Sequence, residues 1–134
     1  MTRTAAFLVF LAALNGLMSV LAGAWAAHGF GLPLVDGGAV LAETGSRFQM
    51  WHALALFGVG LALDRAVTAR FWLVLAALGF IIGIAGFSGG LYATASGLSL
   101  PSLAPVGGFA LMAGWGLLAL AGLVALALPR AGLR

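Results

Sequence analysis

Residues 71–129 read FWLVLAALGFIIGIAGFSGGLYATASGLSLPSLAPVGGFALMAGWGLLALAGLVALALP and contain no Asp, Glu, Lys or Arg. A bilayer hydrocarbon core about 30 Å thick takes about 20 helical residues to cross. This run is therefore long enough for two crossings. The two prolines within Ser99–Pro105 divide it, because proline disrupts the interior of a helix. We predict two membrane-spanning helices here, roughly 71–93 and 106–128.

Two further uncharged runs precede this one, residues 4–35 and residues 48–63. The first predicts a helix over roughly 5–27. The second is only about 24 Å long as a helix, so its helix is expected to begin earlier, near residues 39–43, with a span of roughly 44–63. The first run imitates a secretory signal peptide, but its length of about 20 residues favours a retained helix. The prediction is one all-α domain, residues 1–134, forming a polytopic four-helix transmembrane bundle.

Composition excludes a soluble fold. Hydrophobic residues make up 63% of the chain, charged residues only 7%, and the mean hydropathy is +1.18. Soluble domains carry roughly 25% charged residues, so this chain has too little polar surface for water. The absence of cysteine excludes disulfides, thiolate metal sites and cysteine nucleophiles.

The six basic residues are all arginines, and the net charge is +3. A basic chain can bind nucleic acid, but here the arginines are better explained by membrane topology. In a four-span chain Arg47 lies on one side of the membrane. The other side carries Arg3, Arg65, Arg70, Arg130 and Arg134. This asymmetry predicts that both termini and the 64–70 loop lie in the cytoplasm, with the lipid bilayer as the partner and no nucleic-acid partner.

Small residues recur at helical spacing in three of the predicted helices. Because hydrophobic force does not draw helices together in lipid, small residues that allow close approach become the packing surfaces. The predicted packing residues are Asn15, Ser19, Gly23 and Ala27 in the first helix, Gly79, Gly83, Gly86 and Gly90 in the third, and Gly107, Ala110, Gly114 and Ala121 in the fourth. The same surfaces could form a dimer contact, and Asn15 is expected to hydrogen-bond a neighbouring helix.

Polar side chains within the spans gather in the half that this topology places toward the periplasm. Polar groups in a membrane are costly, so each is a functional candidate. Glu43 and Arg47 are four residues apart, and Gln49 and His52 are three apart on one helix face. The sequence predicts a titratable, ligand-binding pocket. Its candidate residues are His28, Glu43, Arg47, Gln49, His52, Ser88 and Tyr92.

Two chemistries remain open for this pocket. His28 and His52 could ligate a haem iron, and Glu43 with Arg47 and His52 could relay protons or bind an anionic head group. Two histidines seldom hold a labile metal, however, so we expect no metal site and no resident cofactor, with haem as the exception to test. Ser88 and Tyr92 share a helix face, but the sequence contains neither Ser-x-x-Lys nor Gly-x-Ser-x-Gly, so we expect no enzymatic activity.

Four segments together resemble one family of small membrane proteins. They are Gly23–Phe30, Phe48–Leu56, Phe87–Tyr92 and Ala104–Trp115. Their order and spacing are similar to those of the domain of unknown function 423 family, which is related to eukaryotic transmembrane protein 256. The resemblance implies four helices and, in bacteria, an inner-membrane location, and it brings no established activity. Its third motif usually reads Phe-Ser-Gly-Ser-Leu-Tyr, whereas this chain has Gly90 at the second serine.

Two classes of function follow from these observations. The first is a non-enzymatic scaffold or accessory protein, or a lipid- or small-ligand-binding bundle, with a larger membrane complex or a second copy as its protein partner. The second is a small proton-coupled transporter or a haem or redox carrier using His28, His52, Glu43 and Arg47. Small multidrug-resistance transporters, which are similar in length and helix count, depend on a carboxylate in their first helix. This chain has only Asn15 there, so transport ranks second.

Overall fold

The structure is a computed structural model, and it describes residues 1–128. Within this range the chain forms helices and no strands. The helices are α1 (Arg3–His28), α2 (Gly38–Arg65), α3 (Arg70–Gly83), the π-helical turn η1 (Ile84–Ser88), α4 (Gly89–Ala95) and α5 (Leu103–Ala127). Because α3, η1 and α4 follow one another without a break, they form a single rod, and the all-helical prediction is confirmed with four rods.

The predicted boundaries need two corrections. The second helix begins at Gly38, one residue before the expected start near residues 39–43 and six before the rough span of 44–63, because Gly37 has a positive φ of 74° and ends the preceding loop. The third rod contains a π-helical turn that the sequence analysis did not predict. Such a turn inserts one extra residue into an α-helix and occurs often at functional sites.

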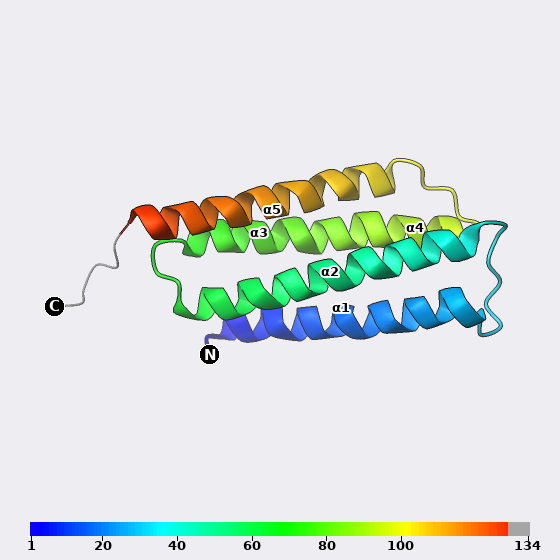
Figure 1. The fold of residues 1–134 in the computed structure, drawn as a ribbon, viewed down its shortest axis with the longest axis horizontal. Coiled ribbons are helices and arrows are strands. Elements are labelled where there is room, and N and C mark those ends of the chain that lie inside the picture. Colours follow the sequence, from blue (N-terminus) through cyan, green and yellow to red (C-terminus); the bar gives the residue numbers. More distant parts are fainter. Residues whose placement is uncertain (129–134) are drawn as a thin grey trace.

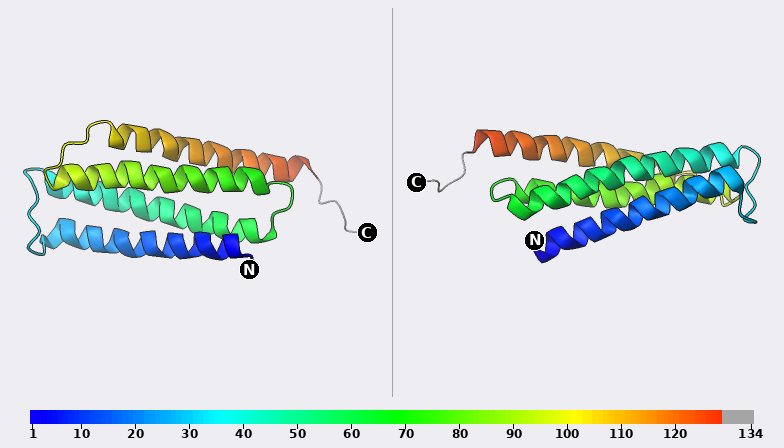
Figure 2. Two further views of the ribbon diagram at one scale, coloured as in Figure 1. Left: turned by 180° about the vertical axis from the view of Figure 1, so that it is seen from behind. Right: turned by 60° about the horizontal axis from the view of Figure 1, so that its bottom comes forward.

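The rods lie antiparallel in the order α1, α2, α3–η1–α4, α5 (Figures 1 and 2). Among the described residues, α1 packs extensively only on α2, whereas α5 packs on α3 and η1. The N-terminus and the end of α5 lie at one end of the bundle (Figure 1). Loops 29–37 and 96–102 lie at the other, which we call the distal end.

Three rods are long and apolar enough to cross a membrane: α1, residues 70–95 and α5. The remaining helix, α2, is not among them, because polar residues such as Arg47, Gln49 and His52 lower its hydropathy. The core is made by residues such as Leu56, Val59, Leu63 and Phe80, all of which are almost completely buried. Large apolar side chains also cover the outside, where Phe10 is 61% exposed, as expected for a surface that faces lipid.

The glycine stripe of the third rod packs on α5, as the sequence predicts. A Cβ added to Gly79 would lie 2.9 Å from Cα of Gly114, and one added to Gly86 would lie 2.8 Å from Cα of Gly107. The neighbouring contacts are Gly83 with Leu111 and Gly90 with Ala104. Larger side chains at these positions would force the two rods apart, so the stripe is an internal packing surface.

The stripe of α1 packs on α2 and is partly held by hydrogen bonds. The hydroxyls of Ser19 and Ser46 each donate to the other residue's carbonyl oxygen, both at 2.9 Å. Gly23 leaves room for the same Ser46 side chain, because a Cβ there would lie 3.0 Å from its Oγ. These contacts fix the register of α1 on α2 and so place Asn15 level with Gln49, about one helical turn away.

Candidate functional site

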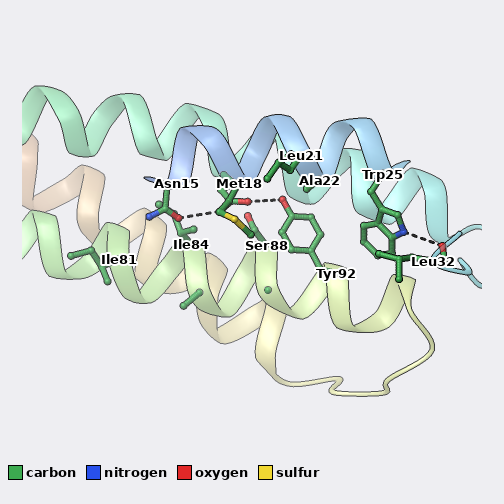
Figure 3. Close-up of a pocket in the computed structure, with 13 residues that line it drawn as sticks. Asn15, Met18, Leu21, Ala22, Trp25, Leu32, Ile81, Ile84, Ser88 and Tyr92 are labelled. Carbon is green, nitrogen blue, oxygen red and sulfur yellow. Dashed lines mark hydrogen bonds between the residues drawn. The ribbon is translucent and has the colours of Figure 1, made fainter. Parts of the chain in front are cut away.

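A cavity of about 520 Å³ lies between α1 and the α3–η1–α4 rod, with α2 behind it (Figure 3). We call it the lateral groove. It is lined by Asn15, Met18, Leu21, Ala22, Trp25, Leu32, Gln49, Ile81, Ile84, Ala85, Ser88, Gly89 and Tyr92. Most of these side chains are apolar, and none of the lining residues in the described part of the chain is charged. The groove exists because α1 leans on α2 and leaves the third rod uncovered on this side.

A chain of hydrogen bonds crosses the back of the groove. The Tyr92 hydroxyl donates to Oε1 of Gln49 at 2.7 Å, and Nε2 of Gln49 donates to Oδ1 of Asn15 at 3.0 Å. Nδ2 of Asn15 then donates to the Leu11 carbonyl at 2.9 Å. The dashed lines in Figure 3 mark the first two of these bonds. Three rods are thereby linked through buried Gln49, and the prediction that Asn15 bonds a neighbouring helix is confirmed.

Two contacts position the Tyr92 ring at the distal end of the groove. Gly45 of α2 leaves space for the ring, since a Cβ there would lie 2.7 Å from Cε1 of Tyr92. Trp25 meets the ring edge to face, with centroids 6.4 Å apart, and its indole N–H donates to the Leu32 carbonyl at 3.1 Å. The groove is therefore closed distally by aromatic rings whose polar atoms are already bonded.

Ser88 is the exception within the groove. Its side chain is 1% exposed, and its Oγ has no hydrogen-bond partner among the described residues. It is the last residue of the π-helical turn, directly before Gly89. Buried polar groups normally have partners, so an unpartnered one requires an explanation such as a missing ligand or water.

His52 lies on the other side of α2 and is fully hydrogen-bonded. Its Nδ1 is 2.7 Å from the Phe48 carbonyl, and its Nε2 accepts from the Trp115 indole N–H at 3.1 Å. A carbonyl can only accept and an indole N–H can only donate, so these contacts assign the neutral imidazole with its proton on Nδ1. Neither ring nitrogen is free for a metal in this arrangement, and the Phe80 ring packs beside it.

The seven candidate residues do not form one pocket, and this prediction is wrong. Gln49 and His52 are three residues apart, yet Gln49 bonds Asn15 and Tyr92 while His52 bonds Trp115 of α5. Residues three apart differ by about 60° around a helix. Because α2 has a rod on each side, this difference is enough for the two side chains to meet different rods. Of the seven, the structure brings together Gln49, Ser88 and Tyr92.

The other candidates lie elsewhere on the bundle. Asn15 and Gln49 are hydrogen-bonded and therefore lie at the same level of the bundle. His28 is exposed and lies thirteen residues from Asn15 toward the distal end, whereas His52 lies three residues from Gln49 toward the other end. Sixteen residues of helical rise separate the two histidines by about 24 Å, too far to share a haem iron. Glu43 and Arg47 form an exposed pair with N–O separation 4.0 Å. Among the described residues, no three His, Asp or Glu side chains lie close enough to hold a metal ion.

Several groove residues were not predicted as site residues. The sequence predicts packing and an interhelical hydrogen bond for Asn15 but no part in a pocket, and it does not indicate Trp25 as a site residue. An indole N–H near mid-membrane needs an acceptor, and this signal could have paired Trp115 with His52. Gly90, where the family motif has a serine, faces Ala104 of α5, so that position lies outside the groove.

The arginine pattern is visible in the structure only in part. Arg3, Arg65 and Arg70 lie at the end that holds the N-terminus, and Arg47 lies in the distal half. Arg130 and Arg134 lie outside the described residues. The predicted orientation, with both termini in the cytoplasm, therefore stays a prediction from the positions of the arginines in the sequence.

Comparisons with known proteins agree with the resemblance seen in the four motifs. The family described as "Protein of unknown function (DUF423)" matches residues 22–108. The chain is 34% identical over 119 residues to the UPF0382 inner membrane protein YgdD of Escherichia coli K12, covering 86% of this chain and 88% of that one.

Two further relatives are similar over most of the chain. The UPF0382 membrane protein YwdK of Bacillus subtilis is 35% identical over 80% of this chain and 88% of its own. A UPF0382 membrane protein of Haemophilus influenzae is 38% identical over 78% of this chain and 84% of its own. No solved structure matches. The helical bundle, the membrane-compatible rods and these similarities show that the chain belongs to the DUF423 family of membrane proteins.

Proposed function

We propose that this chain is a non-enzymatic bundle of the inner membrane that binds a membrane lipid or another small amphipathic molecule in the lateral groove. The observation that carries the proposal is an apolar cavity of about 520 Å³ with an unbonded, buried Ser88 hydroxyl in its wall. Small-molecule sites are typically concave, apolar, about 300–1,000 Å³ in volume and furnished with a few placed polar groups. The groove has these properties.

The groove opens at the side of the bundle, where an occupant can enter from the bilayer. Met18 and Leu21 of α1 line it and are also 49% and 53% exposed. On the opposite wall, Ala85 is small and exposed. In a membrane these residues face acyl chains, so hydrocarbon can move into the groove without crossing water.

The proposal includes α2 as a fourth membrane span. Its charged residues are near its two ends, and residues 48–63 between them carry none. Gln49 and His52 within that stretch are buried and bonded to neighbouring rods, which satisfies the need for internal partners in lipid. The helix also lies between α1 and the third rod along its length (Figure 1).

The proposed orientation has both termini in the cytoplasm and the distal loops in the periplasm. Arg3, Arg65 and Arg70 would then be cytoplasmic, and Arg47 would be periplasmic, as the positive-inside rule favours. Asp36→Cys, in the loop between α1 and α2, should react with a membrane-impermeant maleimide added to the periplasmic side. Labelling only after the cytoplasmic face is opened would reverse this orientation.

The proton-relay and haem hypotheses have less support. Glu43 is exposed and nine residues from His52 along α2, about 14 Å of rise. Both nitrogens of His52 are engaged by Phe48 and Trp115. A relay or an axial ligand would first have to break one of these bonds, whereas the groove needs no rearrangement to hold an occupant.

Gly89 offers a direct test of groove occupancy. It lines the groove, and a Cβ built there would meet nothing within 4 Å, so Gly89→Leu should fill the space without moving the helix. The matched control is Gly116→Leu on α5, where a Cβ also meets nothing within 4 Å and the position lies outside the groove. Both substitutions replace a helical glycine and should slightly favour the helix.

The measurement is native mass spectrometry of the full chain purified in mild detergent from its own membranes. We expect a discrete bound mass on the wild type and on Gly116→Leu, and its loss on Gly89→Leu. An equal bound mass on all three proteins would place the lipid outside the groove and refute the proposal. A bare wild-type chain after gentle extraction would refute it as well.

A further inference from the structure

Ser88 differs from Thr44 and Thr94 within the helices and from Ser96 directly after α4. Thr44, Thr94 and Ser96 each donate to the carbonyl four residues back, at 2.8, 3.0 and 2.6 Å. This back-bonding is the usual way for a helix to satisfy a serine or threonine hydroxyl. Ser88 makes no such bond.

The π-helical turn explains the difference. The carbonyl four residues before Ser88 belongs to Ile84, and the N–H of Gly89, five residues after Ile84, donates to it. In this wider turn the Ile84 carbonyl is aligned with the N–H one residue beyond Ser88, so Ser88 does not have the α-helical position from which Thr44 and Thr94 bond back to a carbonyl. The Ser88 side chain lies instead among the residues that line the lateral groove (Figure 3). The hydroxyl is held buried beside a cavity and has no bond of its own.

The hydrogen-bond donors around the groove that have no acceptor in the protein favour a ligand with an acceptor atom. Tyr92 has committed its only hydroxyl hydrogen to Gln49. The amide groups of Asn15 and Gln49 each have two hydrogens and donate one of them within the described residues. Together with the Ser88 hydroxyl, the groove therefore has spare donors and, among its lining residues, no cation to neutralise an anion.

We infer that the groove takes an uncharged amphiphile whose carbonyl or ester oxygen accepts a hydrogen bond from Ser88 Oγ. This inference rests on the proposed function and specifies its ligand class. Ile81 and Ile84 lie on one side of Ser88 and Trp25 on the other (Figure 3). With its carbonyl on Ser88, the occupant would place its hydrocarbon chain against the two isoleucines. A carboxylate or phosphate is not matched here, because burying a charge without a partner is costly.

Three probes with the same hydrocarbon chain separate these possibilities: methyl palmitate, hexadecane and palmitate. Each is added to the full chain at equal mole fraction in mild detergent, and occupancy is measured by native mass spectrometry. We expect methyl palmitate to bind the wild type more tightly than either other probe. Ser88→Ala should weaken methyl palmitate about five- to tenfold, as for one lost hydrogen bond, and leave hexadecane unchanged.

The matched control is Ser102→Ala, an exposed hydroxyl outside the groove, which should bind all three probes like the wild type. If methyl palmitate and hexadecane bind equally and Ser88→Ala changes neither, the inference fails, although loss of both probes in Gly89→Leu would still support the groove. Tighter binding of palmitate would also overturn it. If Gly89→Leu alters no probe, the proposed function fails with it.

Discussion

Two polar clusters flank α2, and they differ in how completely their hydrogen bonds are made. On one side is the groove cluster, Asn15, Gln49, Ser88 and Tyr92, beside a cavity of about 520 Å³ and with one hydroxyl unbonded. On the other side is the histidine cluster, His52 with the Phe48 carbonyl and the Trp115 indole, where both imidazole nitrogens are engaged.

In this bundle the residue type alone does not indicate which polar side chain is available to a ligand. Histidine is the side chain most often associated with ligation and proton transfer, yet here it joins two rods. Serine is less often assigned such a role, yet within residues 1–128 Ser88 is the buried side chain whose polar atom has no hydrogen-bond partner. A satisfied cluster stabilises the fold, and an unsatisfied one beside a cavity is available to a ligand.

The largest expected effect is in the histidine cluster. His52→Ala removes a buried ring and leaves the Trp115 N–H without its acceptor, so the free energy of unfolding should fall by about 2–4 kcal/mol. Circular dichroism during SDS titration in mixed micelles measures this change. The control is His28→Ala, an exposed site that should change little. If the two variants had the same free energy of unfolding, His52 would not stabilise the fold as described.

The next effect concerns the bonded part of the groove cluster. Gln49→Leu keeps a similar volume but leaves the Tyr92 hydroxyl and Oδ1 of Asn15 without a partner, at a cost of about 1–3 kcal/mol. The same SDS titration is the measurement. A variant as stable as the wild type would mean that both groups find other partners, and the groove cluster would then be less ordered than described.

A smaller effect of opposite sign is expected at Ser88. Ser88→Ala removes a buried hydroxyl that has no partner, so apo protein should be unchanged or more stable by up to about 1 kcal/mol. The comparison between clusters depends most directly on this result. A clear loss of stability in delipidated protein would mean that Ser88 already has a bond, and the contrast between the two sides of α2 would disappear.

The smallest effect is expected at the exposed pair. Glu43 and Arg47 are 61% and 58% exposed and 4.0 Å apart, so Glu43→Gln should alter the unfolding free energy by less than about 0.5 kcal/mol. Repeating the titration at high salt should abolish even this difference. A loss comparable with that of His52→Ala would show that the pair belongs to a buried network.

Much of the fold was predictable because its signals are local. The uncharged run 71–129, divided by Pro101 and Pro105, predicts two helical rods, and two rods are found there. Glycines spaced by three and four residues predict a packing face, and Gly79 and Gly86 do pack on α5. The start of α2, expected near residues 39–43, is found at Gly38, because the uncharged run 48–63 is too short to cross a bilayer by itself.

The candidate site was less predictable. Gln49, Ser88 and Tyr92 were selected from the cost of polar groups in lipid, and they do meet. His28, Glu43 and Arg47 were selected by the same argument, and they lie apart and exposed. Depth in the membrane follows from position along the sequence, whereas the direction of a side chain around its helix depends on which rods stand beside it.

The sequence alone determined that this is a membrane-embedded helical chain, since bilayer thickness and the scarcity of charge leave few alternatives. It also predicted the glycine face by which the third rod packs, since small residues permit close approach, but it left open whether the partner was α5 or a second copy. Only the tertiary structure decided that α1 leans on α2 and leaves a groove, that His52 is bonded on both nitrogens, and that Ser88 is not bonded. The reason is that hydrogen bonds between rods depend on their register, rotation and local helix type, which long-range packing sets.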